Sequence, residues 1–158
     1  MTNSLLTRLQ SQGWQIDLYS RPHPLPPVLT ARCPALPAPW QDWLRTVRRM
    51  VHRGETAWFL CADDYAGRTD SAFRWNEWEL LSLESAAGDD AWSREIRAFW
   101  DRHLPILQSV ARGYAYCALD LQDGSVVWGT EPEFEECRPA APSLPAFLES
   151  LAAGTALF

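Results

Sequence analysis

The chain has 158 residues, of which 47% are hydrophobic and 22% charged, and its formal net charge at pH 7 is −6. This length is typical of one domain, and the composition argues against a disordered chain. Apolar runs fall short of the ~20 residues of a membrane span, and the first ten residues lack the apolar stretch of a signal peptide. Net negative charge argues against general nucleic-acid binding. We therefore expect a single cytoplasmic domain over 1–158 that binds neither membranes nor nucleic acid.

Charge is distributed unevenly along the chain. Residues 1–53 hold seven Arg and two acidic residues, a net charge of +5. Residues 54–112 hold six Arg and eleven acidic residues (−5), and residues 113–158 hold one Arg and seven acidic residues (−6). The basic first third could fold onto the acidic remainder and partly neutralise it. Alternatively, the acidic regions could form a face that attracts a basic partner.

The first part of the chain contains two predicted helices separated by a proline-rich loop. A short helix is expected over 5–12 and a strand over 14–19. Residues 22–39 carry seven of the twelve prolines and are predicted to form an ordered surface loop. A second helix is expected from Pro39 to Gly54. Its apolar stripe of helical period comprises Trp40, Trp43, Leu44, Val47 and Val51.

Three strands and one helix are predicted in the middle and later parts of the chain. The apolar run over 56–62 is typical of a buried strand, and a second strand is expected over 73–81. An amphipathic helix is predicted over 92–104. A strand over 133–138 is expected to place Phe134 in the core, because alternate residues of a strand face the same side.

A hairpin is the most strongly indicated element. Residues 114–121 and 125–128 flank an Asp-Gly pair at 123–124, which accepts the positive φ angles of a two-residue type I′ turn. Such a turn places Leu119 opposite Trp128. Both faces of this hairpin are largely apolar, so a central position in the sheet is expected.

The last predicted helix begins at Leu144, with Ser143 as its N-cap, and stops at Gly154. It is expected to share one core with the hairpin and with three aromatic residues from earlier in the chain. The residues of this predicted core are Leu119, Leu121, Val126, Trp128, Phe147, Leu148, Trp43, Phe59 and Phe99.

The sequence contains no recognisable catalytic or cofactor motif. P-loop, GxGxxG and GxSxG patterns are absent. Cysteines occur at Cys33, Cys61, Cys117 and Cys137, without the CxxC or His spacing of a zinc site, and reduced thiols are expected. The acidic runs lack the spacing of a calcium loop. We therefore expect no enzyme activity, no metal and no cofactor.

Two acidic segments are the candidate partner-binding residues. Both flank predicted strands, where loops at sheet ends can converge on one rim, and aromatic side chains near the first segment could anchor an interface. Core burial of the Trp and simple solvation of the acids are the structural alternatives. The first segment comprises Asp63, Asp64, Tyr65, Asp70 and Trp75, and the second comprises Glu131, Glu133 and Glu135.

The stretch from His103 to Leu151 resembles the SUKH superfamily, which includes fungal cell-wall-assembly regulators and bacterial toxin-immunity proteins. The resemblance lies in a Leu-Pro-Ile segment at 104–106, a Gly-led strand ending in Leu-Asp-Leu at 119–121, a turn, a Val-rich strand, an acidic stretch and a closing helix. It implies an α+β fold in which helices pack on a curved, mostly antiparallel or mixed sheet. It further implies an immunity protein that neutralises a cognate toxin by binding it, without catalysis. The alternative is a regulatory or scaffolding domain that binds an endogenous protein.

Overall fold

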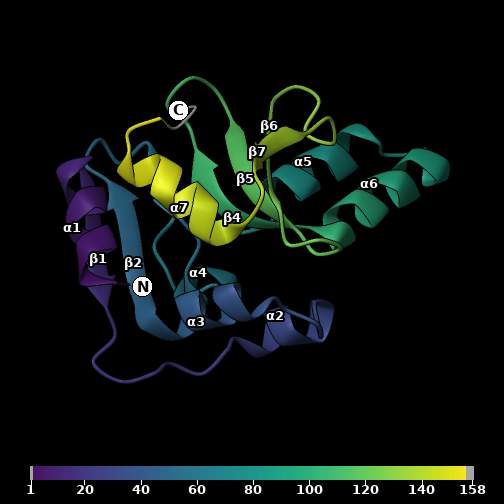
Figure 1. The fold of residues 1–158 in the computed structure, drawn as a ribbon. Helices are drawn as coiled ribbons and strands as arrows, with labels where there is room; N and C mark the ends of the chain where they lie inside the picture. Colours follow the sequence, from purple (N-terminus) through teal and green to yellow (C-terminus); the bar gives the residue numbers. More distant parts are fainter. Residues whose placement is uncertain (1, 156–158) are drawn as a thin grey trace.

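The computed structural model describes residues 2–155. Its single sheet contains seven strands whose spatial order equals their order in the chain, and every neighbouring pair is antiparallel (Figure 1). The α+β class and the mostly antiparallel sheet are therefore confirmed. The strands are β1 (Trp14–Leu18), β2 (Val47–His52), β3 (Ala57–Phe59), β4 (His103–Ser109), β5 (Ala115–Asp120), β6 (Val126–Thr130) and β7 (Arg138–Ala141).

The described helices fall into groups on the two sides of this sheet. In Figure 1, α1 and α7 lie together in front of it, whereas α5 and α6 form a pair on the side of the molecule away from β1. The helices are α1 (Asn3–Ser11), α2 (Pro27–Arg32), α3 (Ala38–Thr46), α4 (Ala62–Tyr65), α5 (Glu77–Ser85), α6 (Asp90–Arg102) and α7 (Leu144–Ala152).

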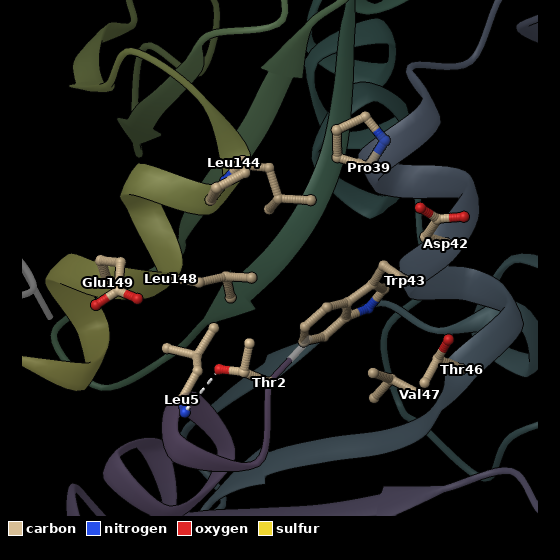
Figure 2. Close-up of a pocket in the computed structure, with 11 residues that line it drawn as sticks. Thr2, Leu5, Pro39, Asp42, Trp43, Thr46, Val47, Leu144, Leu148 and Glu149 are labelled. Carbon is tan, nitrogen blue, oxygen red and sulfur yellow. Dashed lines mark hydrogen bonds between the residues drawn. The ribbon is translucent and has the colours of Figure 1, made fainter.

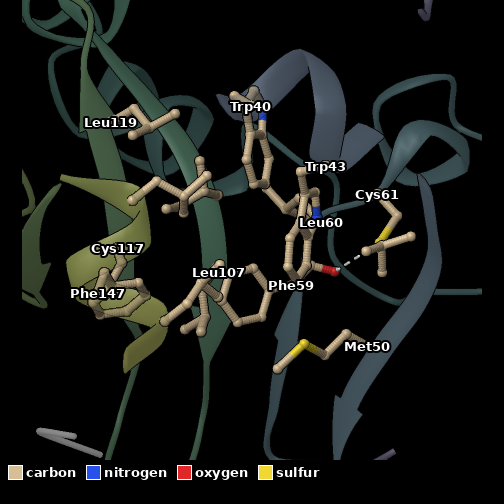
Figure 3. Packing of buried hydrophobic residues seen from close by; sticks show 14 of the residues in the cluster. Trp40, Trp43, Met50, Phe59, Leu60, Cys61, Leu107, Cys117, Leu119 and Phe147 are labelled. Atoms are coloured by element: carbon tan, nitrogen blue, oxygen red, sulfur yellow. Dashed lines mark hydrogen bonds between the residues drawn. The ribbon is translucent and has the colours of Figure 1, made fainter. Parts of the chain in front are cut away.

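The first face of the sheet carries the larger core, beneath α1, α3 and α7. Phe59 lies at its centre, with ring centroids 4.7 Å from Trp43, 5.6 Å from Trp14 and 6.3 Å from Phe147 (Figure 3). Most of the predicted core is found here, with Leu121 and Trp128 partly buried at its margin. Alternate side chains of each strand point to this face, which unites residues distant in the chain.

The second face carries a smaller core beneath α5 and α6. Trp100 packs there against Tyr116 from β5, and Trp78 stacks on Phe134. Phe99 packs against this second cluster, so its predicted place in the first core is wrong. The face of β5 opposite the first core is thus also covered, which confirms the central position expected for the hairpin.

Three element assignments are wrong. Residues 47–52 form β2 rather than the end of a helix, residues 73–81 contain a turn and the start of α5 rather than a strand, and residues 103–109 form the central strand β4. Pro105 pairs with Ala118 directly before the β4–β5 register shift, and such irregularities are where strands tolerate proline. The proline-rich segment 22–39 is not purely a loop, because it contains α2 and the start of α3.

The hairpin forms with a different turn. Leu119 pairs with Val126 and Cys117 with Trp128, so the predicted register is displaced by two residues. A displacement of two leaves every side chain on its predicted face. The Asp120 amide donates to the Ser125 carbonyl at 2.9 Å, and the loop is longer than two residues.

Of the remaining C-terminal assignments, the closing helix is confirmed and the strand before it is wrong. Residues 133–137 lie in a turn and loop and β7 begins only at Arg138, although Phe134 is buried as expected. The Ser143 hydroxyl caps α7 by accepting from the Ala146 amide at 3.3 Å, and Gly154 follows the helix with a φ of +71°.

Candidate functional site

A cavity of about 580 Å³ opens where β2 and β3 diverge. These strands pair at a single position, Val51 with Trp58, whereas β1 and β2 pair along their whole length. Trp58 in turn pairs with Gln108, and Gln108 with Tyr116, so this row belongs to the second face of the sheet. We refer to this cavity as the groove. Its lining residues are Asp17, Arg48, Arg49, Val51, Glu55, Trp58, Phe59, Asp63, Asp64, Thr69, Asp70 and Ser71.

Ion pairs within the chain neutralise part of the groove. Arg48 lies 3.5 Å from Asp17, and Arg49 lies 3.9 Å from Glu55. Arg68, just outside the lining, pairs with Asp63 at 2.7 Å. Arg48 thus pairs within the first third of the chain, Arg49 pairs with Glu55 just beyond it, and Arg68 pairs within the first acidic segment, so the groove is not a face of one sign.

Two carboxylates of the groove have no cationic partner in the described part of the chain. Asp64 accepts a hydrogen bond from the backbone N–H of Cys61 at 2.8 Å, where it caps α4. Burial raises the pKa of Asp64, and the bond from Cys61 opposes this effect. Asp70 is exposed on the following loop. The groove therefore keeps an excess of negative charge.

The first predicted segment is divided by the fold. Asp63, Asp64 and Asp70 all line the groove, as the candidate site requires. Tyr65 is wrong as an interface anchor, because it is 2% exposed and its hydroxyl donates to the carbonyl of Pro105. Its position in α4 turns it inward, beneath the acidic residues that precede it.

Trp75 lies beside a second cavity of about 370 Å³. It is half-buried, with its ring 5.4 Å from that of Tyr65 and the Arg32 guanidinium 5.5 Å above it. Asp64 and Ser71 line both this cavity and the groove, so the loop at 66–72 separates the two.

The second predicted segment is mainly structural. Glu131 accepts from the Tyr114 amide at 2.7 Å, and Glu135 accepts from the Trp100 indole at 2.7 Å. Only Glu133 is exposed beside a cavity, a hollow of about 330 Å³ that also contains Trp128. The predicted convergence of both acidic segments on one rim is wrong, because the aspartates of the first segment line the groove and Glu133 of the second lines a separate hollow.

Sequence reasoning missed Arg48, Arg49 and Trp58 as groove residues. The helix predicted from Pro39 to Gly54 placed the two arginines on its polar, solvated side, away from the acidic segment. A strand over 47–52 would have placed them at the sheet, next to the strand that leads into Asp63 and Asp64. Trp58 could have been identified from the apolar run at 56–62. Successive side chains of a strand point to opposite faces, so Trp58 faces away from Phe59.

A separate apolar cavity of about 360 Å³ lies between α1, α3 and α7 (Figure 2). Leu5, Trp43 and Leu148 point toward its interior, and Asp42 and Glu149 stand at its margin. Glu149 is paired with Arg8 at 2.7 Å. None of the predicted partner-binding residues lies here.

The described histidines and cysteines show no activated pair. His103 is buried, its Nδ1 lies 2.9 Å from the Phe99 carbonyl, and its Nε2 is 3.8 Å from Asp120. Asp120 is held by two bonds from Arg102, at 2.9 and 2.6 Å. Burial raises the pKa of all four cysteine thiols, which disfavours the nucleophilic thiolate.

Searches for known relatives found no family model, no curated protein and no solved structure that matches this chain. Between residues 2 and 155, no helix is both long and apolar enough to span a bilayer. Over the same residues, His, Cys, Asp and Glu side chains form no group of three or more that could hold a metal ion.

Proposed function

We propose that this protein is a non-catalytic, cytoplasmic binding protein that neutralises a cognate bacterial toxin by direct contact. The observation that carries the proposal is the groove, which combines a partly apolar floor with an excess of carboxylates on an open part of the sheet. The resemblance of the C-terminal half to the SUKH superfamily supports an immunity role in particular.

The charge pattern favours a basic partner. Five acidic residues and two arginines line the groove, and Glu133 adds an exposed carboxylate elsewhere on the surface. Such an imbalance attracts a basic protein over distances of about one Debye length, ~8 Å at physiological salt. It raises the association rate more than the final affinity.

The test is coexpression with the product of the neighbouring gene, followed by affinity and size-exclusion chromatography. We expect a stable one-to-one complex whose association rate falls as salt is raised. The Asp70→Lys/Glu133→Lys double variant should associate about tenfold more slowly. Both residues are exposed and outside the cores, so the fold should be retained.

Asp42→Lys is the control, because Asp42 is also exposed but lies on α3, outside the groove. It should associate at nearly the wild-type rate. No complex with the neighbouring product, or an association rate independent of salt, would contradict the proposal. Stable capture of an endogenous host protein instead would favour the regulatory alternative.

A further inference from the structure

We propose that the groove is a receptor for an arginine side chain of the partner protein. This inference rests on the proposed function in that the partner is taken to be a protein. It goes further by naming the group that is recognised and the residues that recognise it. Asp64 and Asp70 supply the charge, and Trp58 supplies an aromatic surface.

The position of the groove follows from the strand geometry. One pairing joins β2 to β3, after which α4 and the loop at 66–72 form the opposite wall. Val51 and Trp58 lie side by side on one face at this pairing. They provide a floor over which the aliphatic part of a long side chain can lie.

After the ion pairs within the chain are counted, the groove still has more carboxylates than cationic side chains. Arg48 and Arg49 have partners at 3.5 and 3.9 Å, and Asp63 has Arg68 at 2.7 Å. With these three pairs removed from the count, Asp64 and Asp70 are the carboxylates left on the groove lining. One cation bound to them would therefore offset one of the two remaining negative charges of the groove.

Guanidinium fits this site better than ammonium does. The Trp58 ring is held by stacking on Phe73, with centroids 5.7 Å apart and planes 27° apart. A planar guanidinium can lie on an aromatic ring and still direct N–H groups sideways to carboxylates. Lysine presents a compact, strongly hydrated charge that stacks less well.

The test uses two small probes of nearly equal shape, N-acetyl-arginine methylamide and its neutral analogue N-acetyl-citrulline methylamide. Titrations are followed by NMR through the Trp58 indole N–H and the amides of Thr69 and Asp70, with a Trp58→Phe variant to assign the indole signal. We expect saturable shifts with arginine at a Kd of roughly 1–10 mM, since one charged contact with stacking is a weak interaction by itself. Citrulline should give no saturable shift.

The Asp64→Asn/Asp70→Asn variant should weaken arginine binding at least about fivefold. Asparagine keeps an oxygen that can accept from the Cys61 amide, so the cap of α4 is preserved. Asp42→Asn is the control and should bind as wild type does. Equal shifts with citrulline, shifts centred on Glu133 and Trp128, or unchanged binding by the double variant would overturn the inference.

The outcomes separate this inference from the proposed function. If arginine fails to bind but the neighbouring gene product still forms a complex, the arginine site is wrong and the proposed function stands. If arginine binds but no toxin partner is captured, the site stands and the immunity role is wrong.

Discussion

The two faces of the sheet are covered in different ways. The face under α1, α3 and α7 carries one large apolar cluster, in which Trp40, Leu44 and Met50 are fully buried. The face under α5 and α6 carries a smaller aromatic cluster and the buried polar side chains of Gln108 and Asp120. Toward β1 and β2, the same face opens into the groove.

The two faces therefore differ in how their packing responds to pH and charge. Continuous apolar packing contains no titrating groups, so it stabilises the fold without depending on pH. Buried polar groups need matched partners, and they transmit changes of charge to stability. The incompletely covered part of the second face also leaves charged side chains exposed, whereas the first face is closed by apolar packing.

The largest expected effect is on the first face. Phe59→Ala should lower the free energy of unfolding by about 4 kcal/mol, because Phe59 is 1% exposed and contacts three aromatic rings. Urea denaturation measures this loss, which should be the same at neutral and mildly acidic pH. A loss below about 1 kcal/mol would mean that this face is not one tightly packed unit.

A buried ion pair gives the next effect, beside the second face. Arg32 from α2 makes two bonds, at 2.7 and 2.8 Å, to Glu79 of α5, which is 5% exposed. Arg32→Met should cost about 3 kcal/mol, because it leaves a buried carboxylate unpaired. The Arg32→Met/Glu79→Met double variant should recover most of this loss in urea denaturation.

The exposed pair of Arg8 with Glu149 provides the control for that measurement. Arg8→Met should cost less than about 1 kcal/mol, since exposed ion pairs contribute little. Equal losses from Arg8→Met and Arg32→Met would contradict the distinction drawn between the two pairs.

A smaller effect should depend on pH. Burial lowers the pKa of His103 below its ordinary value of 6.5, outweighing the opposing effects of the Phe99 carbonyl and Asp120. Below pH 6.5 the unfolded chain takes up a proton that the folded protein resists, so stability falls as pH falls. The slope is at most about 1.4 kcal/mol per pH unit. Denaturation of wild type and His103→Leu from about pH 7 to about pH 5.5 measures it, and equal slopes would exclude His103 as the cause.

The smallest effect is expected in the hairpin that both faces share. Gly124 has a φ of +77°, and a β-branched residue resists this conformation although open space surrounds it. Gly124→Val should cost about 1 kcal/mol in thermal unfolding. Gly54→Ala is the control, because Gly54 does not have a positive φ. Equal melting temperatures for wild type and Gly124→Val would contradict the turn conformation.

Elements that are specified by a few neighbouring residues could be predicted from the sequence. Ser143, the stripe from Leu144 to Leu151 and Gly154 define α7 at its start, face and end. The hairpin kept its predicted faces despite a changed register, because a displacement of two residues preserves alternation. Asp63, Asp64 and Asp70, which were grouped in one predicted segment, lie together on the lining of the groove.

Elements stabilised by distant partners were not predictable in this way. Val47 and Val51 are four residues apart, a spacing compatible with one face of a helix or of a strand. Pairing with β1, 29 to 38 residues away along the chain, selects the strand. The apolar run of β4 is covered on both faces, so it shows no alternation by which a strand could be recognised.

The family resemblance of the C-terminal half implied the α+β class, which the structure confirms. By itself, the sequence determined the closing helix, the two faces of the hairpin and the presence of acidic segments next to aromatic residues. These properties depend on spacings of a few residues. Only the tertiary structure decided that Tyr65 is buried, that Glu131 and Glu135 bind backbone and indole N–H groups, and that arginines of the first third neutralise part of the groove. The physical reason is that burial and charge pairing depend on which distant segments meet, and the sheet brings these segments together.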